Sequence, residues 1–343
     1  MPNKPFVSII IPCFQEKNFI GRCLDSLIQN SYPKEKLEIL VMDGESTDKT
    51  REIIKEYEEK YPFIRLKDNP QRFQPFALNK GIKEAKGDII IRCDAHAEYS
   101  KNYIEKLVYW LQKDRKIGNV GGIWINRPTN DSLKAKAITY TLAHPFCVGP
   151  NRYRIGVKKP TFVDTVPFGA WRKEIFDKVG FFNEKFIRAQ DLEFNLRLKK
   201  AGYKILLDPE IKIIYYPRDS FKKLFLMMFQ YAYWKLIVNK KLKIISSFRQ
   251  FAPPIFILYL FSAVILSFLS PLVWLPLGVY LILTLIFSLQ LALKHKDLKI
   301  FPFSFWSFVI SHIGYGLGYL KGVLDVYLKK EKSLDKKYTK ITR

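Results

Sequence analysis

The stretch IIIRCDAHAEY, Ile89–Tyr99, starts as an apolar run and ends on polar side chains. The isoleucines predict a buried β-strand. Asp94 and His96 follow it two residues apart, so in an extended chain both side chains point the same way. Neither helps to pack an apolar core, and ligands of open α/β sheets bind beyond the carboxyl ends of the strands. We therefore expect Asp94 and His96 to line a ligand site.

Segments typical of strands and of helices alternate around this stretch. Residues 6–11, FVSIII, and 37–43, LEILVMD, are strand-like, and each is followed by a segment with helical spacing of apolar residues. Such alternation predicts a mainly parallel, Rossmann-like sheet flanked by helices. The two strands also lead into polar residues, Pro12 and Glu16 after one and Asp43 at the end of the other. All of these motifs are expected to converge on one edge of the sheet.

The composition changes near Phe251. The run Pro253–Leu293 contains no charged residue, and it is long enough for about two membrane crossings of about 20 residues each. A helix pair in a soluble core is the alternative. A third apolar segment, Phe301–Tyr327, follows, and both the loop at 294–299 and the tail at 329–343 are basic. Because basic segments prefer the cytoplasm, we expect two spans with a re-entrant or in-plane third segment, while three spans stay open.

The chain of 343 residues carries a net charge of +25, which favours an anionic partner such as nucleic acid, a phosphorylated substrate or acidic lipid. No stretch resembles an RNA- or DNA-reading motif, so we expect no nucleic-acid partner. A basic, membrane-tethered nucleic-acid-binding protein is the alternative from another class. The four cysteines form no metal-ligand or disulfide pattern, and the first residues lack the features of a signal peptide. We expect the N-terminal domain to be cytoplasmic.

Four ordered stretches resemble the inverting GT-A glycosyltransferases of family 2, in particular the bacterial branch that makes succinoglycan and other exopolysaccharides. They are VSIIIPCFQEKNFIGRCLDSL, LEILVMDGESTDKT, LNKGIKEAKGDIIIRCDAHAEY and VPFGAWRKEIFDKVGFFNEKFIRAQDLEFNLRLKKAGYKI. The resemblance covers about residues 5–240. It implies a GT-A fold and inverting transfer of a sugar from a nucleotide diphosphate donor, expected to be a UDP-sugar. It also implies a saccharide acceptor linked to polyprenyl diphosphate at the cytoplasmic face of the inner (plasma) membrane.

Position by position, the resemblance assigns roles to the polar residues at the strand ends. Pro12, Glu16, Asp43 and Asp94 would bind the donor nucleotide, with Asp43 at the base. Asp94 and His96 occupy the Asp-x-Asp position and would hold a divalent metal. Histidine in place of the second aspartate favours Mn²⁺ over Mg²⁺. A helix cap is the alternative role for Asp94, and a surface position is the alternative for His96.

Asp191, in RAQDLEFNLRL, matches the aspartate of the family's Glu-Asp motif, and Gln190 replaces the glutamate. In the family this aspartate is the general base, which takes the proton of the acceptor hydroxyl while a metal stabilises the leaving diphosphate on the opposite side. The alternative is an N-cap for a helix expected at 192–201.

Two further stretches supply candidates for the acceptor or diphosphate side. FQYAYWK places Gln230 and Trp234 as in the Gln-x-x-Arg-Trp motif of processive synthases, but Tyr233 stands in place of the arginine. HPFCVGPNRYR contributes Arg152 and Arg154, with a plain solvated loop as the alternative. A processive polysaccharide synthase and a polyprenyl-phosphate sugar transferase remain the alternative activities.

These patterns divide the chain into four expected parts. Residues 1–218 form the GT-A domain, 219–250 an amphipathic helix at the membrane interface, 251–328 the membrane segment and 329–343 a basic cytoplasmic tail. The expected fold class is therefore α/β, followed by an interfacial helix and transmembrane helices.

Overall fold

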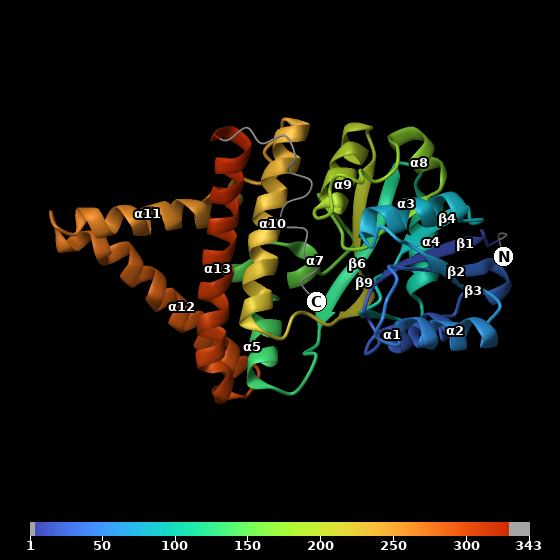
Figure 1. Cartoon of the computed structure of the whole chain (residues 1–343), viewed down its shortest axis with the longest axis horizontal. Helices are drawn as coiled ribbons and strands as arrows, with labels where there is room; N and C mark the ends of the chain where they lie inside the picture. Colours follow the sequence, from blue (N-terminus) through green and yellow to red (C-terminus); the bar gives the residue numbers. More distant parts are fainter. Residues whose placement is uncertain (1–3, 329–343) are drawn as a thin grey trace. The chain divides into compact units, whose positions relative to one another are not determined.

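The computed structural model describes residues 4–328, which form two compact units (Figure 1). The first, called the sheet unit, contains residues 4–125 and 155–215 of the described chain. The second, called the helical unit, contains residues 126–154 and 216–328. The predicted basic tail at 329–343 lies outside the described residues.

The sheet unit is built on nine strands in the order β3-β2-β1-β4-β8-β6-β9-β5, with β7 also paired to β9. The strands are β1 (Val7–Cys13), β2 (Leu37–Asp43), β3 (Ile64–Asp68), β4 (Ile89–Arg92), β5 (Ala97–Tyr99), β6 (Ile117–Asn126), β7 (Thr161–Phe162), β8 (Ala170–Arg172) and β9 (Lys204–Tyr215). Strands β1 to β4 are parallel, whereas β8 pairs antiparallel with β4 and β6, and β9 with β5 and β7. The sheet is therefore mixed, and its parallel half is the part that the alternating pattern predicts.

Helices cover both faces of this sheet, which is why its central strands are apolar on both sides. They are α1 (Ile20–Ile28), α2 (Thr50–Lys60) and α4 (Tyr103–Lys113) on one face, and α3 (Gln74–Glu84), α8 (Glu174–Val179) and α9 (Gln190–Lys200) on the other. Ile9 and Ile11 of β1 share a core with α1, α2 and α4. Ile10 faces α3, whose Gly81 has no room for a side chain, because a Cβ there would lie 2.6 Å from Ile10 Cγ2.

The parallel register brings the strand ends together. Cys13 of β1 pairs with Asp43 of β2, and Asp43 with Asp68 of β3. Asp94 and His96 lie in the short connection between β4, which is parallel to β1, and β5. The predicted convergence of the strand-end motifs on one edge is therefore observed.

The helical unit consists of long apolar helices and three shorter ones. They are α5 (Leu133–Thr141), α6 (Pro145–Val148), α7 (Arg152–Ile155), α10 (Phe221–Leu242), α11 (Ala252–Leu266), α12 (Leu275–Lys294) and α13 (Phe301–Val323). Three segments are long and apolar enough to cross a membrane: Phe248–Leu266, Pro271–Lys294 and Leu298–Leu328. The first two form a helical hairpin over the uncharged run, with its turn near Pro271. The third is one continuous helix over Phe301–Val323, so an in-plane helix and a third span remain as its alternatives.

Helix α10, the helix expected at the interface within 219–250, packs side by side with α13 (Figure 1). Gly314, Gly318 and Gly322 of α13 recur every fourth residue and face α10. A Cβ at Gly318 would lie 2.2 Å from the carbonyl oxygen of Phe229. Such small-residue spacing lets two helix backbones approach closely, as in helix pairs inside membranes.

Residues 126–154 leave the sheet after β6 and pack within the helical unit. The carbonyl oxygen of Phe146 in α6 accepts a hydrogen bond from His312 Nε2 of α13, at 2.9 Å. The Tyr280 hydroxyl of α12 lies 3.0 Å from His312 Nδ1 and can donate to it. These partly buried polar contacts hold α6 against α13 and connect α13 to α12.

Candidate active site

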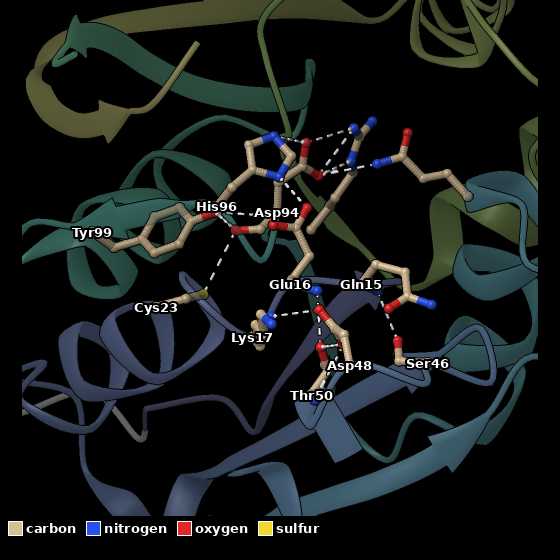
Figure 2. Close-up of polar contacts among 12 residues, drawn as sticks. Gln15, Glu16, Lys17, Cys23, Ser46, Asp48, Thr50, Asp94, His96 and Tyr99 are labelled. Carbon is tan, nitrogen blue, oxygen red and sulfur yellow. Dashed lines mark hydrogen bonds and ion pairs between the residues drawn. The ribbon is translucent and has the colours of Figure 1, made fainter. Parts of the chain in front are cut away.

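Asp94 is fixed through both its backbone and its carboxylate (Figure 2). The Tyr99 hydroxyl accepts from the Asp94 N–H at 2.7 Å and donates to its carbonyl oxygen at 3.3 Å. Oδ1 accepts from Arg92 Nε and Nη2, both at 3.2 Å, and from Gln74 Nε2 at 3.1 Å. The side chain is buried and does not cap α4, whose N-cap residue is Asn102.

His96 bridges two acids from different strand ends. Its Nδ1 lies 3.0 Å from Glu16 Oε1, and its Nε2 lies 3.9 Å from Asp94 Oδ2 (Figure 2). The Glu16 backbone N–H in turn donates to Thr50 Oγ1 at 2.9 Å. When Nδ1–H donates to Glu16, the ring's lone pair is on Nε2, on the side of Asp94. His96 is therefore an oriented, largely buried side chain and not the surface residue of the alternative interpretation.

The donor atoms of Asp94 and His96 suit a divalent cation. Two ligand atoms each about 2.1 Å from an ion are about 3.0 Å apart at neighbouring octahedral positions, so Nε2 and Oδ2, which are 3.9 Å apart, would move closer to share an ion. A carboxylate behind the ligating imidazole, as Glu16 lies behind His96, is the usual support of a metal-binding histidine. Among residues 4–328 there is no group of three or more His, Cys, Asp or Glu side chains placed to hold an ion. A cation here would take its remaining ligands from a bound molecule and from water.

The loop after β2 is organised by Asp43, which is completely buried. Its oxygens accept from the Ser46 hydroxyl at 2.6 Å, the Ser46 N–H at 2.9 Å and Arg51 Nη1 at 2.9 Å. The Ser46 hydroxyl also accepts from the Gln15 N–H at 2.8 Å, which ties this loop to the one after β1. Pro12, the penultimate residue of β1, is partly exposed at the same edge. Asp43 and Pro12 thus shape the edge, and their contacts with a ligand stay predictions.

Several non-glycine residues around this edge have a left-handed backbone, which is uncommon for residues with a Cβ. They are Gln15 (φ 57°), Glu45 (φ 60°), Arg72 (φ 64°), Phe168 (φ 61°) and Ala189 (φ 58°). Three of them follow β1, β2 and β3, one precedes β8 and one precedes α9. Strained backbone of this kind concentrates at functional sites, and here it surrounds the Asp94 cluster.

Asp191 is the second residue of α9 and is partly exposed. Helix α9 starts at Gln190, earlier than the expected 192–201, and its N-cap residue is Ala189. The N-cap role considered for Asp191 is therefore wrong. Its Oδ1 lies 2.8 Å from the Leu192 N–H, within the first turn, where an acid is favoured by the helix dipole.

The first turn of α9 is connected to Asp94 through Gln74, and neither Gln74 nor Arg92 was expected at the site. The Gln190 amide donates to Gln74 Oε1, and Gln74 donates to Asp94 Oδ1. Arg92 is buried beside Asp94; burial alone would lower its pKa, but the charges of Asp94 and then Asp191 raise it. An arginine within the apolar run before Asp94 was the available signal, whereas nothing marked Gln74, the first residue of α3.

The four acceptor-side candidates lie in the helical unit, whereas the Asp94 cluster lies in the sheet unit. Arg152 and Arg154 belong to α7, and Gln230 and Trp234 to α10. The Trp234 side chain is buried, with 1% of its surface exposed.

Known proteins resemble this chain over most of its length. The family description "Glycosyl transferase family 2" matches residues 8–180. A dolichyl N-acetyl-alpha-D-glucosaminyl phosphate 3-beta-D-2,3-diacetamido-2,3-dideoxy-beta-D-glucuronosyltransferase of Methanococcus voltae is 37% identical over 243 residues, which are 69% of this chain and 74% of the relative. Succinoglycan biosynthesis protein ExoA of Rhizobium meliloti is 28% identical over 92% of this chain and 94% of its own length.

A solved structure shares the fold. The mannosyltransferase of Pyrobaculum calidifontis, in complex with GDP-Man and Mn²⁺, matches with a TM-score of 0.60 and 20% identity, over 94% of this chain and 88% of the other. At this identity the likeness concerns the fold alone. It agrees with the expected fold class, a GT-A-type sheet with flanking helices and C-terminal helices long enough to span a membrane.

Proposed function

Because the chain belongs to glycosyl transferase family 2 and is a glycosyltransferase, we propose that it moves a sugar from a UDP-sugar to a lipid-linked saccharide with inversion of the anomeric carbon. The observation that carries this proposal is the cluster at one edge of the sheet, where Asp94 and His96 lie together and Asp94 connects through Gln74 to the first turn of α9. That turn carries Asp191. One edge would therefore supply a cation site and a separate carboxylate, the two groups that this chemistry needs.

On the donor side, Asp94 and His96 would hold the divalent cation, with Mn²⁺ favoured over Mg²⁺ because one ligand is an imidazole nitrogen. When bound, the cation supplies neutralisation of the charge that develops on the leaving diphosphate. Glu16 would orient His96, a role supported by their 3.0 Å contact. Pro12, Asp43 and Asp94 would line the nucleotide. The GDP-Man and Mn²⁺ of the mannosyltransferase that shares the fold support this class of donor.

On the acceptor side, Asp191 would act as the general base. A new bond forms between the acceptor oxygen and the anomeric carbon while the bond to the diphosphate breaks, and the hydroxyl proton passes to the Asp191 carboxylate. Because this is a single displacement, the anomeric configuration inverts. Partial exposure at the start of α9 supports this role, since a base must be reachable by the acceptor.

The acceptor would be a saccharide carried on a polyprenyl phosphate or diphosphate. The name of the Methanococcus relative describes a sugar on dolichyl phosphate, and that of the Rhizobium relative describes succinoglycan biosynthesis. The three apolar helical segments would anchor the enzyme in the inner (plasma) membrane, with the sheet unit on the cytoplasmic side. Arg152 and Arg154 would meet the lipid phosphate, while Gln230 and Trp234 would help to pack α10.

We propose addition of a single sugar and not processive synthesis. Tyr233 stands where the processive motif has arginine, and its hydroxyl donates at 3.2 Å to Oδ2 of Asp325, in the π-helical turn Leu324–Leu328 that follows α13. This side chain holds two helices together and is not a cation that could meet a phosphate.

The direct test is nucleotide release by purified protein across a panel of nucleotide sugars, with lipid-linked saccharides as acceptors and Mn²⁺ or Mg²⁺ present. We expect release of UDP that depends on both the acceptor and the metal, with one sugar added per acceptor. A product ladder would favour a processive synthase, and no release from any donor would contradict the proposal.

A further inference from the structure

Arg92 is a buried cation at the end of an apolar strand. Ile89 and Ile91 of β4 pack into the core with α1, α2 and α4, so Arg92 points to the opposite face of the sheet. Asp94, two residues further on, lies on the same side as Arg92 and contacts it. The Arg92 side chain is only 6% exposed. A charge buried to this degree is costly unless it is paired, so its position needs a reason.

The contacts of Arg92 differ between the two carboxylate oxygens of Asp94. Its Nε and Nη2 both approach Oδ1 at 3.2 Å, and Gln74 donates to the same oxygen at 3.1 Å. Oδ2 is 3.5 Å from Nη2 and 3.9 Å from His96 Nε2. Three donors therefore gather on one oxygen, which turns the other toward the histidine.

The remaining nitrogen, Arg92 Nη1, is buried and has no hydrogen-bond partner within residues 4–328. Buried donors are nearly always bonded, so an orphan of this kind calls for an explanation. Asp191 follows Gln190 in the first turn of α9 and is partly exposed. The Gln190–Gln74–Asp94 hydrogen bonds lead to the same turn of α9.

We propose that Arg92 is a positioning residue shared by the two acids of the transfer reaction. It holds Asp94 Oδ1 so that Oδ2 faces the cation, and its Nη1 becomes the donor to Asp191 when the sugar donor is bound. This inference rests on the proposed roles of Asp94 and Asp191. A fixed positive charge would thus lie between the cation site at Asp94 and the general base Asp191.

The test compares Arg92→Lys, which keeps the charge but loses the planar fork, with Arg172→Lys as a matched control. Arg172 is a buried arginine of the neighbouring strand β8, and it donates to the backbone carbonyls of Leu111, Arg115 and Ile117. Both variants lose a buried guanidinium. If Arg92 had only a structural role, the two variants would lose similar thermal stability, and Arg92→Lys would bind Mn²⁺ no more weakly than Arg172→Lys. Full-length protein in detergent is titrated with Mn²⁺ in the presence of UDP, and free Mn²⁺ is followed by electron paramagnetic resonance.

We expect Arg92→Lys to weaken Mn²⁺ binding by about 10–100-fold, the usual effect of losing a residue that orients a metal ligand. Arg172→Lys should bind Mn²⁺ within about twofold of the wild type. In transfer assays at saturating Mn²⁺, Arg92→Lys should lower kcat, and the part of this loss that acts through Asp191 should be absent in an Asp191→Asn background because coupled residues are not additive.

Equal Mn²⁺ affinity in Arg92→Lys and wild type, or no binding in the wild type, would overturn the inference. So would an equal effect of the Arg172 variant. Failure of the wild type to use any sugar donor would contradict the proposed function instead, because the Mn²⁺–UDP titration does not require turnover.

Discussion

Replacing Gly318 with alanine should loosen the α10–α13 pair, whereas the same change at Gly278 of α12 should not. A Cβ at Gly318 would lie 2.2 Å from the Phe229 carbonyl oxygen and 2.7 Å from its Cα. Ordinary contact begins at 3.4 Å, so the helices would have to separate locally by about 1.2 Å. A backbone carbonyl cannot rotate out of the way. At Gly278 a Cβ would meet nothing within 4 Å.

The magnitude follows from these contacts. Overpacking of this kind costs about 1–3 kcal/mol, and loss of the adjacent Tyr233–Asp325 hydrogen bond would add about 1 kcal/mol. Alanine stabilises a helix by about 1 kcal/mol relative to glycine. This gain offsets part of the packing cost at Gly318, whereas at Gly278 it is the only expected change in stability. We expect Gly318→Ala to be less stable than wild type by about 1–3 kcal/mol and Gly278→Ala to be equal or slightly more stable.

The assay is thermal unfolding of the full-length protein in lipid nanodiscs, followed by tryptophan fluorescence, since Trp234 lies buried in α10. About 2–4 °C of Tm per kcal/mol predicts a decrease of about 2–12 °C for Gly318→Ala. Equal stability of the two alanine variants would refute the close packing of α10 on α13.

Two other predictions concern the cation site and the membrane. Asp94→Ala should abolish metal-dependent donor binding and His96→Ala should weaken it, as measured by calorimetry with UDP and Mn²⁺, and an unchanged Mn²⁺ dependence in both would reject the pair as ligands. The full-length protein should fractionate with membranes and resist extraction by alkaline carbonate, because α11 and α12 expose apolar side chains along their length. Release at high pH without detergent would show that the hairpin does not span the membrane.

The parallel half of the sheet could be predicted from the sequence, because β1, β2 and β4 are apolar runs that end on polar residues. The antiparallel half could not. Its strands β6 and β9 approach each other so closely that a Cβ at Gly122 would lie 2.0 Å from the Ile211 carbonyl oxygen. Such a contact between distant residues leaves no local pattern. The packing of residues 126–154 in the helical unit depends in the same way on long-range contacts, such as that of His312 with Phe146.

The candidate site was predictable to a similar extent. Asp94 and His96 follow from their spacing after a strand, and the structure brings them together as expected. The resemblance placed Glu16 beside the nucleotide, but its observed partner is His96. This contact joins loops that are eighty residues apart in sequence, so no spacing rule could reveal it. Arg92 is visible in the sequence as a charge in an apolar strand, yet its two hydrogen bonds to one oxygen of Asp94 appear only in three dimensions.

The most direct test of the account is sugar transfer by Asp191→Asn, with Asp177→Asn as control. Asp177 is an exposed acid in the first turn of α8, so both variants lose a similar interaction with a helix dipole. Asparagine keeps the shape of aspartate but cannot accept the proton at neutral pH. We expect transfer by Asp191→Asn to fall by about 10²–10⁴-fold, with donor and Mn²⁺ binding near wild type, while Asp177→Asn transfers normally. Transfer by folded Asp191→Asn within a few-fold of wild type would contradict the central claim.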